Sequence, residues 1–338
     1  MRLALSYRLR LRRRRLNLRA LRKRRELTKI SNRTKAIGKS DVLLFTTIKD
    51  EYSRLPYFLD YYRKLGVGHF LFVDNNSTDG GAEYLKSQTD VSLWSTRESY
   101  RKSRFGMDWL TWLLRVYGHE HWCLIVDADE FFVYPYCDTR PLSALTDWLD
   151  VSELRAFGAM QLDMYPKTGS EKKMYSTGQN PLDIAAWFDT GNYTLEYSPF
   201  LYNLWIQGGP RARRFFYDDP LNAPALNKIP LVKWHRGYAY DSSTHMLLPR
   251  GLNLVYDQRG GEKACGALLH TKFWSTEEFS EKAKLEVQRS EHYSNSYEYK
   301  QYLEGLQKNK EFWTSWSEKY SNWRQLELLG LISKGNWA

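Results

Sequence analysis

Three carboxylates, Asp127, Asp129 and Glu130, follow directly on an apolar segment, residues 123–126, and the chain then turns apolar again. The segment before them is typical of a buried strand. Because side chains alternate along a strand, we expect Asp127 and Asp129 on one side and Glu130 on the other. Two carboxylates this close repel each other unless a cation lies between them, and Mg²⁺ and Mn²⁺ prefer oxygen ligands. The spacing therefore predicts a divalent-metal site, with a solvated turn as the alternative.

The composition excludes several classes of protein. The 338 residues are 42% hydrophobic and 15% aromatic, enough for a large core with aromatic side chains left for binding surfaces. No apolar run reaches the 18 residues of a membrane-spanning helix. Three cysteines without metal-site spacing, Cys123, Cys137 and Cys265, argue against a disulfide framework or a zinc site. They fit a reducing compartment, so we expect a cytoplasmic protein.

The positive charge is concentrated at the N-terminus. Residues 1–40 hold 12 arginines and 4 lysines against one acid, Glu26, a net charge of +15; the whole chain carries +11, so the remainder carries −4. Leucines alternate with the arginines, which predicts a disordered tail or an amphipathic helix. A segment of this kind is attracted to anionic lipid, so we expect peripheral attachment to the inner face of the cytoplasmic membrane. A tail without a specific partner is the alternative, and nucleic acid is the least favoured partner.

Apolar strand-like runs alternate with amphipathic helical segments along residues 41–135. This alternation predicts an α/β fold with a mostly parallel central sheet flanked by helices. Ligands of such sheets bind beyond the carboxyl ends of the strands, and three polar clusters follow predicted strands, at residues 49–51, 74–79 and 127–130. We expect these clusters to form one site. No Gly-x-Gly-x-x-Gly motif or P-loop follows the first strand, which argues against a dinucleotide or P-loop site. A nucleotide at this edge would have to be bound by carboxylates and a metal.

Three segments together resemble a known family. FVDNNSTDG at residues 72–80 resembles the nucleotide-binding segment of GT-A-fold glycosyltransferases, and VDADE at 126–130 resembles their DxD motif. TIKDE at 47–51, with the helix after it, is similar to the start of the family-2-like branch, which makes bacterial surface polysaccharides; Asp50 stands where that branch usually has Asn. The resemblance covers about residues 41–135. It implies a GT-A fold and inverting, metal-dependent transfer from a UDP- or GDP-linked sugar to a glycan or lipid-linked acceptor.

The resemblance also implies roles for individual residues. Metal ligation falls to Asp129, with Asp127 direct or through water, and a late histidine, His245 or His270, with a slight preference for His245. The donor-binding candidates on the resemblance are Glu51, Asp74, Asn76, Arg104 and Asp127. From the residues themselves, Arg211, one of three arginines in a Gly-Pro turn, could bind a diphosphate or an anionic acceptor, and Lys272 could contact phosphate. No motif identifies the catalytic base; Asp163, at the end of a predicted strand, is the first candidate, and Asp189 and Glu196 are the others. For the arginines a solvated surface role, and for the histidines a structural role, is the alternative.

The predicted organisation has three parts: the basic tail 1–40, a GT-A catalytic domain 41–275 and a helical extension 276–338. The catalytic domain divides into a nucleotide-binding half, 41–135, and an acceptor half, 136–275, whose residues 163–225 are rich in Tyr and Trp. These aromatics could pack against sugar rings or simply against one another. Two other functions remain open. One is a nucleotidyltransferase, which is disfavoured because the segment after the first predicted strand is acidic, where that class needs a basic, Gly-rich loop. The other is a non-catalytic module that binds glycan or nucleic acid.

Overall fold

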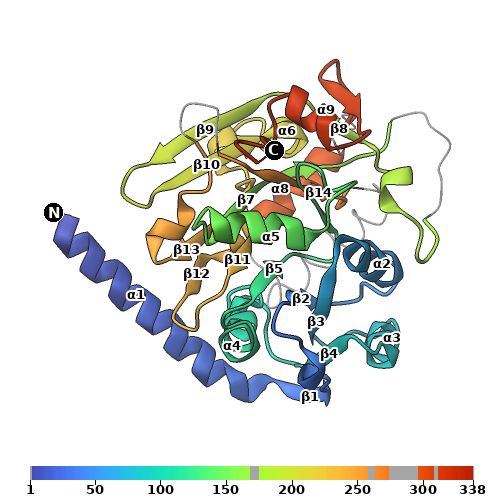
Figure 1. Ribbon diagram of the computed structural model, residues 1–338. Coiled ribbons are helices and arrows are strands. Elements are labelled where there is room, and N and C mark those ends of the chain that lie inside the picture. The colour runs from blue at the N-terminus through green and yellow to red at the C-terminus, as the bar shows by residue number, and fades with distance from the viewer. Residues whose placement is uncertain (1, 168–174, 258–262, 274–295, 308–310, 338) are drawn as a thin grey trace.

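The computed structural model describes residues 2–167, 175–257, 263–273, 296–307 and 311–337. Its centre is a nine-stranded mixed sheet flanked by helices, with the strand order β1-β4-β3-β2-β5-β11-β7-β14-β6 (Figure 1). Its strands are β1 (Thr28–Ser31), β2 (Val42–Ile48), β3 (Val67–Asp74), β4 (Val91–Ser95), β5 (Trp122–Ile125), β6 (Glu130–Val133), β7 (Ala156–Asp163), β11 (Asn227–Lys233) and β14 (Gly266–His270). The predicted α/β class with a helix-flanked sheet is therefore confirmed.

The sheet is less parallel than the sequence predicted. Strands β4, β3, β2 and β5 run parallel to one another, as the βα alternation requires. Strand β11 then pairs antiparallel with both β5 and β7, and β6 pairs antiparallel with β14. Only four of the eight pairings are parallel, so the expectation of a mostly parallel sheet was wrong. Strand direction beyond β5 depends on long connections that leave no local sequence signal.

Both faces of the sheet are buried, which explains why its strands are continuously apolar. On β2, Leu43 and Phe45 belong to one apolar cluster with Trp109, and Leu44 belongs to a second cluster with Phe58. The principal helices are α2 (Leu55–Leu65), α3 (Gly81–Ser87), α4 (Met107–Tyr117), α5 (Leu142–Val151) and α6 (Gly209–Phe215). Helix α2 ends at Gly66, whose left-handed conformation (φ 98°) favours glycine.

The basic N-terminal segment is ordered and packs on the body. Helix α1 (Arg2–Lys23) contacts α4 and strand β12 (Ala239–Ser242), and β1 forms an edge of the main sheet against β4 (Figure 1). The helical alternative for the tail is thus the one observed. The predicted boundary at residue 40 does not separate tail from domain, because β1 lies before it.

The C-terminal region is integrated into the body. Strand β15 (Ser317–Lys319) pairs with β8 (Trp187–Asp189), and Trp337 packs against Tyr134 and Tyr136. The sequence predicts amphipathic helices at residues 276–291 and 297–320 of this region. Helix α8 (Ser296–Gln307) is shorter than the second of them, and α9 (Trp323–Leu328) follows. The predicted helix 276–291 lies outside the described residues. The remaining strands are β9 (Tyr193–Ser198), β10 (Asn203–Gly208) and β13 (Met246–Leu248).

Candidate functional site

The three polar clusters follow neighbouring parallel strands. Strand β2 pairs in parallel with β3 on one side and with β5 on the other, so the three strands present their carboxyl ends at the same edge. Asp74 is the last residue of β3 and lies opposite Ile48, the last residue of β2. The segments 49–51, 74–79 and 126–129 therefore extend from one edge of the sheet, which is where ligands of such sheets bind.

The cluster at the end of β3 begins with Asp74, whose side chain is buried. Its carboxylate accepts hydrogen bonds from the Ser77 N–H at 3.2 and 3.3 Å, and burial raises the pKa of Asp74 more than these bonds lower it. Nearby, the Asp50 carboxylate accepts from the Thr78 N–H at 2.7 Å. Asp50 (φ 52°) and the exposed Asn76 (φ 61°) both adopt the left-handed conformation. Such conformations cost energy in non-glycine residues and concentrate at functional loops.

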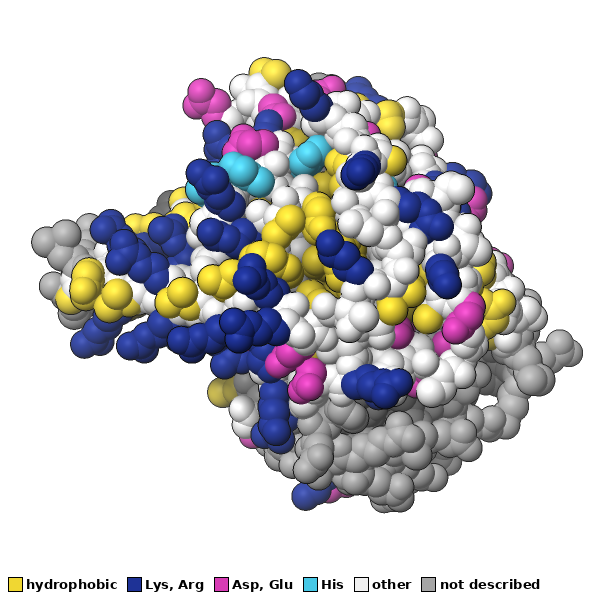
Figure 2. Space-filling model, turned by 90° about the horizontal axis from the view of Figure 1, so that it is seen from below, with side chains coloured by type: hydrophobic (Ala, Val, Ile, Leu, Met, Phe, Trp, Pro, Cys, Tyr) yellow, Lys and Arg dark blue, Asp and Glu magenta, His cyan; other side chains and the backbone are white. Residues whose placement is uncertain are grey.

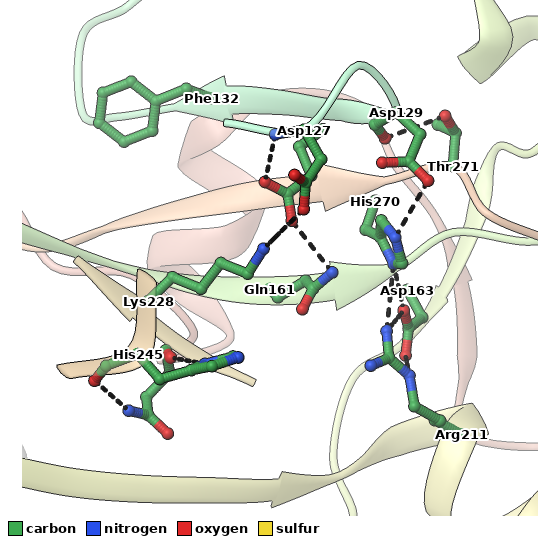
Figure 3. A network of polar contacts seen from close by, with 12 residues as sticks. Asp127, Asp129, Phe132, Gln161, Asp163, Arg211, Lys228, His245, His270 and Thr271 are labelled. Atoms are coloured by element: carbon green, nitrogen blue, oxygen red, sulfur yellow. Dashed lines mark hydrogen bonds and ion pairs between the residues drawn. The ribbon is translucent and has the colours of Figure 1, made fainter. Parts of the chain in front are cut away.

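A turn, rather than a continuing strand, positions the three central carboxylates. Strand β5 ends at Ile125 and β6 begins at Glu130, whose N–H donates to the Asp127 carbonyl at 3.1 Å. The turn breaks the alternation of side chains, so the expected separation of Asp127 from Glu130 was wrong. Both carboxylates instead reach the ammonium of Lys228, which lies 3.3 Å from Asp127 Oδ2 and also contacts Glu130 Oε1 (Figure 3).

Glu130 is a buried structural carboxylate. It is fully buried, accepts from Gln161 Nε2 at 3.1 Å and accepts from the Asp127 N–H at 3.1 Å. Burial raises the pKa of Glu130, and the Lys228 ammonium opposes that rise. For Lys228, burial lowers the pKa, but Glu130 and Asp127 outweigh it and the net shift is upward. The pair fixes the turn that carries Asp127 and Asp129.

Asp129 faces a histidine from the far half of the sheet. Its Oδ2 lies 3.3 Å from His270 Nε2, and its backbone carbonyl accepts from the Thr271 N–H at 2.8 Å. Behind the imidazole, His270 Nδ1 lies 2.6 Å from Asp163 Oδ1 (Figure 3). The imidazole is thus held between two carboxylates; burial lowers the pKa of His270, but Asp129 and Asp163 raise it further than burial lowers it.

Asp163 is oriented and kept ionised by Arg211. The guanidinium lies 2.5 Å from Asp163 Oδ1 and 3.1 Å from Oδ2, and both side chains are almost completely buried. Although burial disfavours its charge, Arg211 and His270 lower the pKa of Asp163 to about 2. A carboxylate that holds its charge so firmly is a weak proton acceptor near neutral pH. The geometry favours Asp163 as the residue that orients His270 over its predicted role as base.

The other predicted bases lie in different settings. Asp189 is buried and binds Arg213, with Nε at 2.7 Å, and the Tyr165 hydroxyl at 2.5 Å. Glu196 is exposed on the β9–β10 hairpin. Among the aromatics of residues 163–225, Tyr165, Phe215 and Phe216 lie in a buried cluster. These three side chains pack against other apolar residues of the protein and are not available to bind a sugar.

The two candidate histidines are placed differently. His245 is only partly buried and lies in another environment, with Nδ1 2.6 Å from the Asn227 carbonyl. Burial and the charge of Lys228 lower the pKa of His245 to about 4. Figure 3 shows His245 apart from Asp129, whereas His270 points at it. The slight preference for His245 as the metal ligand therefore does not fit the geometry.

Three donor-binding candidates are held by protein groups. Glu51 pairs with the buried Arg54, whose pKa is lowered by burial but raised, on balance, by Glu51 and Asp129. Arg104 donates to the Tyr240 and Asp241 carbonyls at 2.9 and 2.7 Å, so it anchors its loop to β12. Burial lowers the pKa of Lys272, while Asp129 and Asp163 are among the charges that oppose this shift. Lys272 and Arg54 thus lie within the electrostatic reach of Asp129.

Sequence reasoning missed Lys228, Gln161 and Arg54. A signal existed for Lys228, since it stands at the start of an apolar strand, and a lysine buried in a strand needs a carboxylate partner. Gln161 in β7 carried the same signal. Arg54 stands at the N-cap of α2 and looked like an ordinary solvated residue.

The residues at Asp129 fit a divalent cation. A carboxylate oxygen and an imidazole nitrogen face each other, and a second carboxylate fixes the far side of the imidazole, the usual support of metal-binding histidines. Among the described residues, no group of three or more His, Cys, Asp or Glu side chains forms a complete metal-binding set. Diphosphate oxygens or water would have to complete the coordination, which is common for Mg²⁺.

No protein-family model matches the chain, and no curated protein sequence matches it. The chemistry of the site must therefore be judged from its residues and their geometry.

Proposed function

We propose that the chain is a metal-dependent glycosyltransferase of the GT-A, family-2-like type, which moves a sugar from a nucleotide-sugar to a glycan or lipid-linked acceptor in surface polysaccharide synthesis. The observation that carries the proposal is the approach of His270 Nε2 to Asp129 Oδ2 at 3.3 Å. The two residues come from distant parts of the sequence, and both were candidate metal ligands on the resemblance alone. Their meeting beside Asp127, at the carboxyl edge of the parallel strands, supports one metal–nucleotide site.

The nucleotide would lie along the ends of β3, β2 and β5. Asp74, at the end of β3, can accept a hydrogen bond from the base or ribose, and Asp127 can contact the ribose. Asp127 suits this contact because 58% of its side chain is exposed and Lys228 holds one of its oxygens. Asp129 and His270 would hold Mn²⁺ or Mg²⁺ on the diphosphate. The cation supplies the positive charge that stabilises the leaving diphosphate.

The protein's own residues prepare this step. Asp163 orients the His270 ring, and Arg211 keeps Asp163 charged, so His270 Nε2 is directed toward Asp129, where the diphosphate would lie. Lys272 and Arg54 add positive charge near Asp129. Inversion requires a carboxylate to accept the proton of the acceptor hydroxyl. Of the three candidates, Glu196 alone is exposed, whereas Asp163 and Asp189 are bound to arginines.

The proposal is tested by isothermal titration of the full chain with UDP, GDP and CDP, each in Mn²⁺ and in EDTA. We expect one nucleotide to bind in Mn²⁺ and to lose about tenfold or more in affinity in EDTA, since the diphosphate then lacks its counter-charge. Preference for a nucleoside triphosphate would instead indicate a nucleotidyltransferase. Absence of binding under every condition would contradict the proposal and favour a non-catalytic module.

A further inference from the structure

Helix α1 is held on the body by one apolar stripe and two ion pairs. Leu9, Leu16 and Ala20 face the body, and Leu16 packs in a cluster with Ala239 and Leu248 of the β12–β13 hairpin. Arg12 pairs with Asp241, and Arg19 Nη2 lies 2.7 Å from Asp108 Oδ2. The orientation of the helix about its own axis is therefore fixed, and its opposite face is presented outward.

The outward face carries a second apolar stripe. Tyr7, Leu11, Leu18 and Leu21, with Arg14 at the middle of the row, recur at spacings of four and three residues, which places them on one side of a helix. Tyr7 is 61% exposed, Leu18 52% and Leu21 39%, although exposed leucines are usually scattered singly. This outward stripe is not needed for docking on the body, which uses the other side.

Arginines flank the outward stripe. Helix α1 contains nine arginines and one lysine, with no acidic residue. Among the residues that the structure describes, Arg8, Arg10, Arg14, Arg15 and Arg22 form no ion pair with any other. Figure 2 shows α1 as an arm at the left, with dark blue side chains along its edges and yellow side chains between them.

A groove continues this surface onto the body. It measures about 230 Å³ and lies between α1 and the segment after β13. Its lining combines three arginines with an apolar wall: Ser6, Leu9, Arg10, Arg13, Leu248, Pro249 and Arg250. Arg250 in turn donates to the Phe200 carbonyl at 2.5 Å, and Phe200 is 51% exposed. Cationic and apolar groups therefore alternate beyond the helix itself.

We propose that the outward stripe of α1 and this groove form a docking surface for an anionic lipid bilayer. Among the described helices none is long and apolar enough to cross a membrane, and α1 instead has the composition of a helix that lies in the interface plane. Leucine and tyrosine side chains would enter the head-group boundary, while the arginines bind lipid phosphates. This inference is independent of the proposed transfer reaction.

Two other occupants explain the surface less well. A nucleic acid would use the arginines, but it has no need of exposed leucines between them. A second copy of the chain would bring together two helices that each carry ten basic residues and no acid, which repel each other. The bilayer accounts for both the charge and the exposed apolar side chains.

The test measures co-sedimentation of the full chain with vesicles of phosphatidylcholine, alone or with a quarter phosphatidylglycerol. We expect binding to the anionic vesicles only. The variant Arg14→Glu/Arg22→Glu should bind at least about tenfold more weakly, because each basic residue near the surface contributes to the attraction. The variant Tyr7→Ser/Leu18→Ser/Leu21→Ser should also lose about tenfold, because it removes the inserted apolar groups.

The matched control is Lys64→Glu/Lys86→Glu, which makes the same change in charge on exposed residues of α2 and α3. It should stay within about twofold of wild type, since charges far from the membrane are screened. Unchanged thermal unfolding of all variants shows that they remain folded. The proposal would be overturned if the chain bound neutral and anionic vesicles equally, or if both α1 variants bound as tightly as wild type. It would also be overturned if the chain bound a duplex RNA but no vesicle, and if the serine variant kept that affinity for RNA.

Discussion

Replacing Asp129 by Asn, or His270 by Gln, should each lower the Mn²⁺-dependent affinity for the nucleoside diphosphate by about 100-fold or more. Substitution of a residue that merely supports a metal ligand typically costs 10- to 100-fold, so loss of a ligand itself should cost at least the upper value. A 100-fold loss corresponds to about 2.8 kcal/mol. Both substitutions preserve size, and the 3.3 Å approach of the two side chains is the feature that they disrupt. The measurement is isothermal titration in Mn²⁺ and in EDTA.

The matched control for this prediction is His245→Gln, the same substitution at the other late histidine. His245 is held by the Asn227 carbonyl and does not face Asp129, so the Mn²⁺-dependent affinity should stay within about threefold of wild type. In EDTA all variants should bind equally weakly. If His245→Gln lost more Mn²⁺-dependent affinity than His270→Gln, His245 would be the metal ligand and the assignment to His270 would be wrong.

Replacing Lys228 by Met should destabilise the fold by about 3–5 kcal/mol. Lys228 is the cation that compensates the fully buried Glu130, and removal of one partner leaves an uncompensated charge in the interior. The adjacent turn should loosen as well, because Asp127 also depends on this ammonium, at 3.3 Å. The loss is measured as the shift in the free energy of unfolding from urea denaturation.

The double variant Lys228→Met/Glu130→Gln provides the control. It removes both charges while the Glu130 side chain keeps its shape, so it should recover most of the loss, to within about 1–2 kcal/mol of wild type. If the single variant costs less than about 1 kcal/mol, or if the double variant is no better than the single one, Glu130 is not held as a charged partner of Lys228 and the proposed function of this pair is wrong.

The local parts of the fold could be predicted from the sequence. Strand β2, helix α2 with its Gly66 cap and the turn after β3 follow from apolar runs, helical spacing and turn residues within short windows. The direction of β11 could not be predicted, because it depends on how a long connection returns to the sheet. The position of β1 at the edge of the sheet could not be predicted either, because this short strand lies within the basic N-terminal segment and has no apolar pattern of its own.

The candidate site shows the same division. Residue type made Asp129 and His270 candidate ligands, but nothing in the sequence established which of His270 and His245 is the ligand, since each stands next to a short apolar run. Strand parity misplaced Glu130, because a turn at residues 126–129 interrupts the strand. Asp163 was predicted as a carboxylate at a strand end, yet its partner Arg211 comes from a distant helix, and that ion pair lowers the pKa of Asp163.

The most direct test of the account is pulsed electron paramagnetic resonance of Mn²⁺ bound to the full chain with the nucleotide found by titration. If Asp129 and His270 hold the cation together, the spectrum should show a ¹⁴N coupling from a directly bound imidazole. That coupling should vanish in His270→Gln and persist in His245→Gln. A Mn²⁺–nucleotide complex of wild type without any ¹⁴N coupling, or with a coupling that survives His270→Gln, would contradict the central claim that these two residues form the metal site.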